Sequence, residues 1–264
     1  MRYYRTTGLT AAQTRELVCL VNEALEKPWS RDGGRRKALG LYRAVSMACM
    51  YLRQNATEEF IGDLHGISQS TVSRYLAALI PVVSAVLEEF VPTADSAAES
   101  VRGRICLVDG TLTPCWSYKG HRKELWNHKH ATTGFNVQLM SLLDGTAVYV
   151  SEPLPGKTND YKAFHDTPAA QIVQHSGGGI GDKGYYGTGM ITPRKKPYRG
   201  EPSKSDKECN AEISALRAPV ERAIAHLKSW RILHTDYRRP YSTYRDAFNA
   251  ARSLFFFSLT DSFE

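Results

Sequence analysis

The chain has 264 residues, of which 42% are hydrophobic and 23% charged, the proportions of a folded globular protein. Its formal charge of +7 suits a polyanionic partner such as nucleic acid, and nearly all of the excess positive charge follows residue 97. Five widely spaced cysteines without a C-x-x-C pair argue against a disulfide framework and a zinc finger, which fits a reduced cytoplasmic setting. No apolar run reaches the roughly 18 residues of a membrane span, so we expect no membrane segment.

The first hundred residues predict helices. Apolar residues recur at helical spacing from Thr10 to Lys27 and again from Leu41 to Leu52. A short helix follows, with Thr57 as its N-cap, Gly66 at its end, and an apolar stripe predicted to be buried: Phe60, Ile61 and Leu64.

Ser68 can cap the next helix, and two short helices joined by His65-Gly66-Ile67-Ser68 predict a helix-turn-helix. In that arrangement the second helix offers its N-terminal outer residues to the major groove. These residues have side chains suited to base edges and phosphates: Gln69, Ser70, Thr71, Ser73 and Arg74. An ordinary helical hairpin with a polar surface is the alternative.

A further helix is predicted to open at Pro81 and to run to Phe90. The small, polar run Thr93 to Ser100 then reads as a linker. We therefore expect an all-α DNA-binding domain at residues 1–97 and a second domain at residues 98–264.

The second domain is predicted to begin with a buried strand, Ile105 to Val108, that ends at Asp109. A buried carboxylate is normally kept only where it meets a partner or a metal ion, although Asp-Gly also starts common turns. Two longer apolar runs follow, joined by Asp144-Gly145, and they predict a hairpin beside the first strand.

More carboxylates lie farther along the chain. Asp160 is placed to cap a helix to about His175, and a very short strand within residues 180–185 carries Asp182. If that strand lies beside the first, Asp182 and Asp109 emerge at the same edge of the sheet. A final helix within residues 208–228 has an apolar face predicted to be buried: Ile213, Leu216, Val220, Ile224 and Leu227. Glu221 adjoins that face, and with a kink or restart at Pro219 the helix could turn Glu221 toward the two aspartates.

Converging carboxylates repel one another unless cations lie between them. Mg²⁺ and Mn²⁺ prefer hard oxygen ligands and bind through a few carboxylates together with substrate phosphate. Taken singly, each acid could be a turn residue or a surface charge, and the three together favour a metal site.

Three sequence blocks resemble the signature of DDE transposases, specifically the bacterial insertion-sequence-five group and its eukaryotic Harbinger relatives. They are Val108-Asp109-Gly110-Thr111, Gly181-Asp182-Lys183-Gly184-Tyr185, and Arg217 and Glu221 followed by Lys228. The segments 134–138 and 155–160 also resemble the second strand and a loop of that family. Two positions depart from the family pattern: Ser214 stands where a tyrosine is common, and Asn159 replaces a histidine.

The resemblance implies an α/β fold with a ribonuclease-H-like catalytic domain, a mixed sheet with helices, after the helix-turn-helix domain. It implies that Asp109, Asp182 and Glu221 are catalytic and hold two ions of Mg²⁺ or Mn²⁺. Asp160 competes for the second position. We prefer Asp182, because it follows a short strand whereas Asp160 is placed to cap a helix.

Several neighbouring residues carry charge suited to phosphate or carboxylate. Arg217 and Lys228 could hold either group, or could be plain surface charge. A basic stretch with Arg194, Lys195 and Lys196 could contact the DNA backbone, or could be a solvated loop. The cluster of three histidines and one cysteine within residues 115–130 is too irregularly spaced to favour zinc.

These features together predict a bacterial transposase that acts near the nucleoid. We expect it to bind the terminal inverted repeats of its element as double-stranded DNA, to cleave them with metal ions, and to join the freed ends to target DNA. Two ends must be brought together, so we expect a homo-oligomer. The alternatives are a domesticated nuclease that mobilises no element and a non-catalytic DNA-binding regulator.

Overall fold

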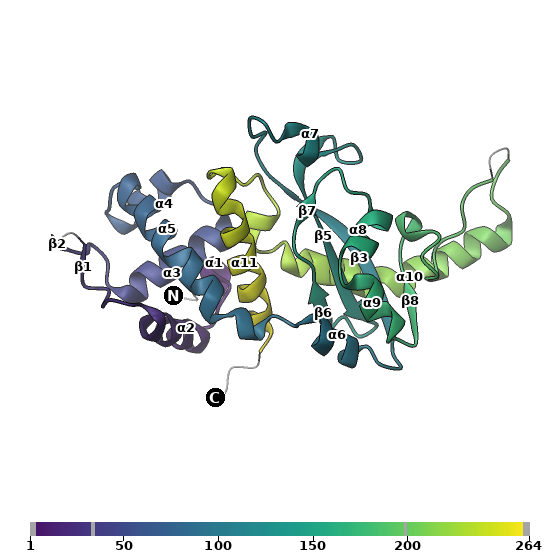
Figure 1. Ribbon diagram of the computed structural model, residues 1–264, viewed down its shortest axis with the longest axis horizontal. Helices are drawn as coiled ribbons and strands as arrows, with labels where there is room; N and C mark the ends of the chain where they lie inside the picture. Colours follow the sequence, from purple (N-terminus) through teal and green to yellow (C-terminus); the bar gives the residue numbers. More distant parts are fainter. Residues whose placement is uncertain (1–3, 33–34, 198–199, 261–264) are drawn as a thin grey trace. The chain divides into compact units, whose positions relative to one another are not determined.

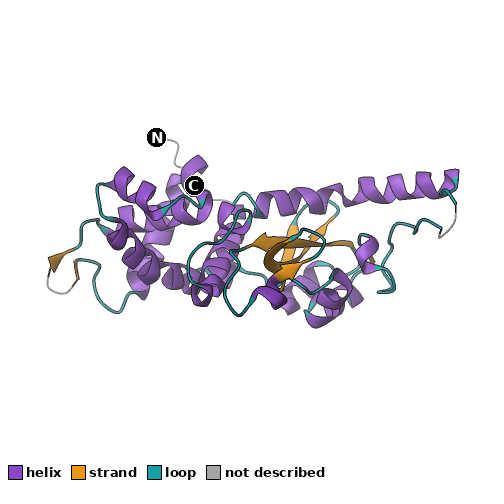
Figure 2. Ribbon diagram, turned by 90° about the horizontal axis from the view of Figure 1, so that it is seen from above, coloured by secondary structure: helices purple, strands orange, loops and turns teal. Residues whose placement is uncertain are grey.

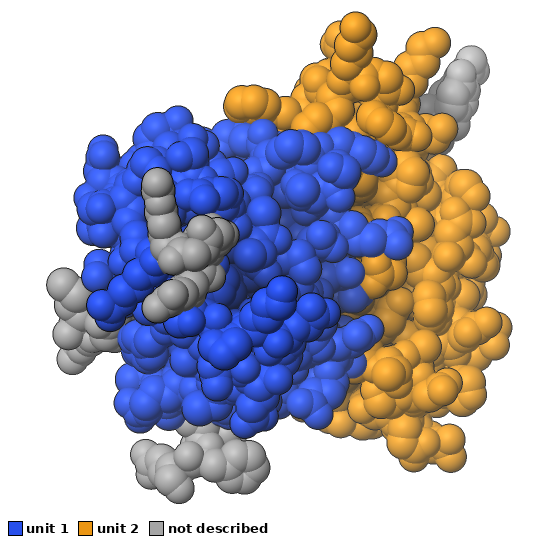
Figure 3. Space-filling model, turned by 60° about the vertical axis from the view of Figure 1, so that its left-hand side comes forward, with its two compact units in different colours: residues 1–91, 228–264 blue, residues 92–227 orange. Residues whose placement is uncertain are grey.

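A computed structural model describes residues 4–32, 35–197 and 200–260. The chain forms two compact units, one of Met1–Val91 with Lys228–Glu264 and the other of Pro92–Leu227 (Figure 3). This division differs from the sequence-based boundaries of 1–97 and 98–264, mainly because the C-terminal segment packs with the helical unit. Its last helix has a phenylalanine-rich face that is buried against the N-terminal helices.

Unit 1 is helical (Figure 1). Its elements are α1 (Tyr4–Thr7), α2 (Ala11–Ala24), β1 (Arg31–Asp32), β2 (Arg35–Arg36), α3 (Leu41–Gln54), α4 (Glu58–His65), α5 (Gln69–Val86), η1 (Glu88–Phe90), η3 (Arg231–Leu233), η4 (Tyr241–Thr243) and α11 (Tyr244–Leu259). Helix α5 packs against α2, α3, α4 and α11, and the buried rings of Phe248, Phe255 and Phe257 come from α11. Burial of this apolar surface is the main stabilising contribution in the unit.

The local signals around the helix-turn-helix are confirmed. Thr57 caps α4 by accepting from the backbone N–H of Phe60, and Ser68 caps α5 in the same way. Gly66 ends α4 with φ of 68°, in the left-handed region that favours glycine.

Two expectations for this segment are wrong. Phe60 and Leu64 are 59% and 57% exposed, because the eight-residue α4 turns only a narrow face, with Ile61, toward its neighbours. Pro81 does not open a new helix, since α5 runs through it. The carbonyl that Pro81 leaves without a helical donor belongs to Ala77, an exposed residue, so water can satisfy it.

Unit 2 is a mixed sheet with helices. Its elements are α6 (Ala94–Ser100), β3 (Ile105–Pro114), α7 (Arg122–Leu125), β4 (Trp126–Asn127), β5 (Thr132–Leu142), β6 (Ala147–Val150), β7 (Leu154–Pro155), α8 (Asp160–Asp166), α9 (Ala169–Gln174), β8 (Gly178–Ile180), η2 (Lys183–Tyr185) and α10 (Lys204–Leu227).

Strand β3 lies between β5 and β8 in this sheet. It pairs antiparallel with β5 and parallel with β8, and β4, β6 and β7 also pair with β5. The predicted hairpin at Asp144-Gly145 is therefore confirmed. A short strand does lie beside the first, but it is Gly178–Ile180, earlier than the predicted range of 180–185, where Lys183–Tyr185 forms a 3-10 helix instead. The first strand, however, does not end at Asp109, because its ladder with β5 continues to the pair of Pro114 with Gly134.

The two faces of the sheet are covered differently. One face contributes Cys106, Val108 and Met140 to a core shared with α6, α8 and α9. Helix α10 lies along the other face and contacts β3 and β5 (Figure 2). Alternate residues of β3 point to opposite faces, so Asp109 and Gly110 face different helices.

Three other expectations for this unit are corrected. The predicted linker forms α6, capped by Thr93 and anchored by the buried Ala97. The predicted helix to His175 breaks into α8 and α9 around Pro168, whose ring cannot continue a helix. Helix α10 runs through Pro219 as one helix.

Among the described residues, no single helix combines the length and apolar character needed to cross a membrane, and one bent helix pair, Gln69–Val86 with Glu88–Ser100, meets that test by length and composition alone.

Candidate active site

Asp109 lies in the middle of β3 as a nearly buried carboxylate. Its side chain is 16% exposed, and its Oδ2 accepts a hydrogen bond from Nη2 of Arg217 at 2.9 Å. Burial raises the pKa of Asp109 to about 6, the Arg217 guanidinium opposes this rise, and the charges of Asp182 and Asp160 add to it. Asp109 is therefore electrostatically coupled to both other aspartates.

Arg217 reaches Asp109 because α10 is rotated differently from the prediction. Leu216 was expected on the buried face, but it is 46% exposed and Arg217 is buried beside it in sequence. A charged residue faces the sheet here because the Asp109 carboxylate supplies an ion-pair partner, without which its burial would be costly.

Asp160 is the first residue of α8, and it does not cap that helix. Asn159 is the N-cap and accepts from the backbone N–H of Lys162 at 2.8 Å. The carboxylate of Asp160 instead lies over the backbone of β3, so close that a Cβ atom at Gly110 would be 2.4 Å from Oδ1 of Asp160. Glycine at position 110 is what leaves room for this carboxylate.

Asp182 follows β8 and lies close to Asp160. Its Oδ1 accepts from the backbone N–H of Gly184 at 2.7 Å. A Cβ atom at Gly184 would be 2.7 Å from Oδ2 of Asp160 and 2.8 Å from Oδ1 of Asp182. The ammonium group of Lys129 is 3.9 Å from Oδ2 of each of these aspartates, so one cation neutralises part of both charges.

Glu221 lies one helical turn beyond Arg217 on α10. Its side chain is 57% exposed, and its Oε1 is 3.8 Å from Nη1 of Arg217. Arg217 thus contacts Asp109 through one nitrogen and Glu221 through the other. The structure brings Asp160 and Asp182 together beside Lys129, and Asp109 lies within electrostatic reach of both. We refer to these three aspartates as the carboxylate cluster. Arg217 connects Glu221 to Asp109.

A buried chain of hydrogen bonds connects Tyr185 to Asp160 through two side chains of β5. The Tyr185 hydroxyl donates to Oε1 of Gln138, Nε2 of Gln138 donates to Oδ1 of Asn136 at 2.8 Å, and Nδ2 of Asn136 donates to Oδ1 of Asp160 at 3.3 Å. Burial, with the three aspartate charges, raises the pKa of Tyr185 well above its usual range, so its hydroxyl remains a donor.

The sequence prediction had assigned no role to these supporting residues. Asn136 and Gln138 could have been noticed, because they are two amides on the same face of an otherwise apolar strand, where polar groups need partners. Lys129 could not, because it comes from the irregular segment between β4 and β5.

The donor set and the charges of the site fit a hard divalent cation. Carboxylate oxygens are the ligands that Mg²⁺ and Mn²⁺ prefer. Two pairs of acids already share a cationic side chain. Lys129 lies near both Asp160 and Asp182, and Arg217 lies near both Asp109 and Glu221. Among the described residues, no three histidine, cysteine, aspartate or glutamate side chains stand close enough to hold a metal as positioned. A three-ligand metal site would therefore require side-chain movement, and the 57% exposed side chain of Glu221 has the freedom to move.

The other predicted contact residues have mixed surroundings. On α5, Gln69, Ser70 and Arg74 are exposed, whereas Thr71 and Ser73 are half-buried. Nη2 of Arg74 donates to Oγ1 of Thr71 at 3.2 Å, which tethers its guanidinium to the helix surface.

The predicted basic stretch already has partners within unit 2. Arg194 forms an ion pair with Asp206 at 2.7 Å, Lys196 forms one with Glu201 at 2.8 Å, and the ammonium of Lys195 lies 3.9 Å from the ring centre of Tyr186. Lys228 comes directly after α10 and is half-buried, and burial lowers its pKa.

Comparison with known proteins gives the family. Residues 108–254 match the family described as DDE superfamily endonuclease, and residues 39–89 match the helix-turn-helix of DDE superfamily endonuclease. The chain therefore belongs to the DDE superfamily of endonucleases, and its mixed α/β unit after a helix-turn-helix is consistent with a ribonuclease-H-like fold. Endonucleases of this superfamily typically use divalent metal ions.

Two relatives align over most of the chain. The "Putative transposase for insertion sequence element IS112" of Streptomyces albus G is 30% identical over 236 residues, which cover 86% of this chain and 83% of the relative. The "Probable transposase for insertion sequence element IS702" of Microchaete diplosiphon is 26% identical over 245 residues, covering 90% and 87%. No solved structure matches the chain significantly.

Proposed function

We propose that the protein is the transposase of a bacterial insertion sequence. In this proposal it binds the terminal inverted repeats of its element, cleaves them, and transfers the freed strands to target DNA. The observation that carries the proposal is the cluster of Asp109, Asp160 and Asp182, with Arg217 linking Asp109 to Glu221. Such a concentration of acids is costly to a fold, and a phosphoryl-transfer site is a reason to keep it.

Asp109, Asp182 and Glu221 are the residues we propose as ligands of two Mg²⁺ or Mn²⁺ ions. When bound, such ions supply positive charge to the transferring phosphoryl group and its attacking and leaving oxygens. Asp160 is proposed as an auxiliary carboxylate, because its contact with Lys129 is shared with Asp182. Arg217 holds the Asp109 carboxylate in place and could release it to a metal ion or turn toward a phosphate oxygen.

DNA contacts are proposed at two surfaces. The N-terminal residues of α5, Gln69, Ser70, Thr71, Ser73 and Arg74, would enter the major groove of the element ends. Arg194, Lys195 and Lys196 would contact the DNA backbone, exchanging their present acidic and aromatic partners for phosphates. Lys228 is proposed as a further phosphate or carboxylate contact.

The subgroup within the superfamily, the cellular location and the oligomeric state are also proposals. The Gly-Asp-Lys-Gly-Tyr block and the spacing of Arg217, Glu221 and Lys228 support membership of the insertion-sequence-five group with its Harbinger relatives. The lack of disulfides among the five cysteines, all of them described residues, and the basic charge support action on the nucleoid in a bacterial cytoplasm. A homo-oligomer is proposed because two element ends must react together.

The test is a cleavage assay on the DNA that flanks the gene. The protein is incubated with duplexes carrying the imperfect inverted repeats of that DNA, with Mg²⁺ or Mn²⁺ and with EDTA as control. We expect nicked products that require the metal and disappear with Asp182→Asn. Repeat binding without any cleavage would contradict the proposal and favour a DNA-binding regulator, whereas cleavage without strand transfer would favour a domesticated nuclease.

A further inference from the structure

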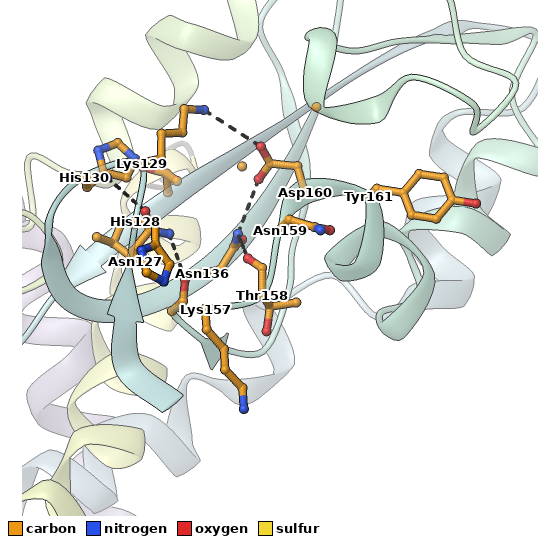
Figure 4. A pocket seen from close by; sticks show the side chains of 15 residues that line it. Asn127, His128, Lys129, His130, Asn136, Lys157, Thr158, Asn159, Asp160 and Tyr161 are labelled. Carbon is orange, nitrogen blue, oxygen red and sulfur yellow. Dashed lines mark hydrogen bonds and ion pairs between the residues drawn. The ribbon is translucent and has the colours of Figure 1, made fainter. Parts of the chain in front are cut away.

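A cavity of about 440 Å³ opens beside Asp160 in unit 2 (Figure 4). One wall is the segment from Asn127 to His130 after β4, and the other is the loop from Gly156 to Asp160 before α8. Its floor is the stretch of β3 that begins at Gly110. The cavity is thus continuous with the carboxylate cluster but extends away from it.

The two walls are held together by specific contacts. Nδ2 of Asn127 donates to the carbonyl of Gly156 at 2.7 Å, and the backbone N–H of Lys157 donates to the carbonyl of Glu124 at 3.1 Å. Gly156 packs so tightly that a Cβ atom there would be 2.3 Å from the carbonyl oxygen of Leu125. The cavity is therefore formed before any ligand arrives, which lowers the entropic cost of binding.

The lining of the cavity suits an anionic strand. Lys129 and Lys157 contribute ammonium groups and His128 and His130 contribute imidazoles, while Asp160 is the one carboxylate among the described lining residues. Figure 4 shows the Lys129 side chain directed toward Asp160 and the Lys157 side chain directed away from it. Because the two ammonium groups point in opposite directions, one could contact the 5′ phosphate and the other the 3′ phosphate of a single bound nucleotide.

The size of the cavity selects the form of the ligand. Pockets of about this volume hold small molecules, and a single nucleotide is a ligand of that size. Enzymes that act on DNA place such a nucleotide in a pocket by turning it out of the stacked duplex. The imidazole of His128, which lines the cavity, can hydrogen-bond to a base edge or stack on its face.

We propose that this cavity binds one unpaired nucleotide of the DNA strand next to the phosphate that is cleaved, with Lys129 and Lys157 on its flanking phosphates. This proposal rests on the proposed function, because it assigns the neighbouring carboxylates to phosphoryl transfer. It adds a requirement for local strand separation at the element end.

The test measures binding of a fluorescent single-stranded (dT)₆ oligonucleotide by anisotropy in EDTA, with a closed hairpin duplex in parallel. The variants are His128→Ala and Lys157→Ala, both at exposed positions, so that the fold is kept. The control is Lys162→Ala, which removes a lysine of α8 that pairs with Asp166 and does not line the cavity.

We expect wild-type protein and the control to bind (dT)₆ equally, and each cavity variant to bind it roughly tenfold more weakly, in the range of losing one base or phosphate contact. Duplex binding should be unchanged. Equal (dT)₆ binding by wild type and both cavity variants, or no (dT)₆ binding by wild type, would overturn the proposal. Because the readout needs no cleavage, a failure of the proposed function would show separately in the Asp182→Asn cleavage assay.

Discussion

Gly110 offers a direct test of the carboxylate cluster. In a Gly110→Ala variant, the new Cβ atom would be 2.4 Å from Oδ1 of Asp160, and ordinary van der Waals contact begins at 3.4 Å. The Asp160 carboxylate must therefore move by about 1 Å. A displacement of this size at a reacting centre can lower the rate roughly 100-fold, which is the loss we expect in metal-dependent cleavage of the flanking-repeat DNA.

Two controls separate this effect from a loss of folding. Gly40→Ala adds the same methyl group where, among the described residues apart from its chain neighbours, no atom lies within 4 Å, and it should cleave at the wild-type rate. If the clash acts through Asp160, then Asp160→Ala and the double variant Gly110→Ala/Asp160→Ala should have rates within a few-fold of each other, because effects that share one contact are not additive. A Gly110→Ala enzyme that folds and cleaves like wild type would refute the reasoning.

Three further predictions follow from charges. Burial raises the pKa of Asp109 from near 4 to about 6, so the metal-free folded protein binds this proton more tightly than the unfolded chain does. Its free energy of unfolding should therefore fall as the pH rises from about 4 to about 6. Urea titrations should show a smaller fall for Asp109→Asn. Arg239→Ala removes the ion-pair partner of the nearly buried Glu58, at 2.7 Å, and leaves it the hydrogen bond from the Gln69 amide. We expect the free energy of unfolding in urea titrations to fall by roughly 3 kcal/mol, and an unchanged value would show that the ion pair is dispensable. Arg74→Ala should weaken binding to the flanking-repeat duplex, and a loss of one phosphate contact should reduce the salt slope by about 1, so an unchanged affinity would remove Arg74 from the interface.

Strand adjacency in unit 2 was predictable from sequence. The apolar run before Asp109 and the hairpin signal at Asp144-Gly145 were sufficient for β3, β5 and β6, because consecutive strands usually pair. The pairing of β8 with β3 could only be posed as a condition, and β8 begins two residues before the predicted strand. The extent of β3 was not predictable, since Asp-Gly ended the apolar pattern while the ladder with β5 continued.

Side-chain roles at the site were less predictable than the strands. Asn159 and Asp160 are both good caps, and local preference cannot decide which one turns toward the sheet. The rotation of α10 was missed for a similar reason, because hydrophobic periodicity favoured Leu216 on the buried face. The Asp109 carboxylate, distant in sequence, places Arg217 there instead.

The unit that the C-terminal segment joins was not predictable from the sequence either. The apolar run of α11 indicates packing, but nothing in its periodicity says which core it joins. Its pairing with α5 depends on contacts between residues far apart in the chain, and only the folded structure supplies these.

Manganese binding tests most directly whether acids from β3, β8 and α10 share metal ions. Isothermal titration of the purified protein with Mn²⁺ is compared for wild type, Asp109→Asn, Asp182→Asn and Glu221→Gln, with Asp166→Asn as an acid of α8 outside the cluster. We predict that each of the first three substitutions weakens binding roughly tenfold or more and that Asp166→Asn leaves it unchanged. Wild-type affinity in Glu221→Gln would contradict the account, because it would leave the third acid outside the metal site.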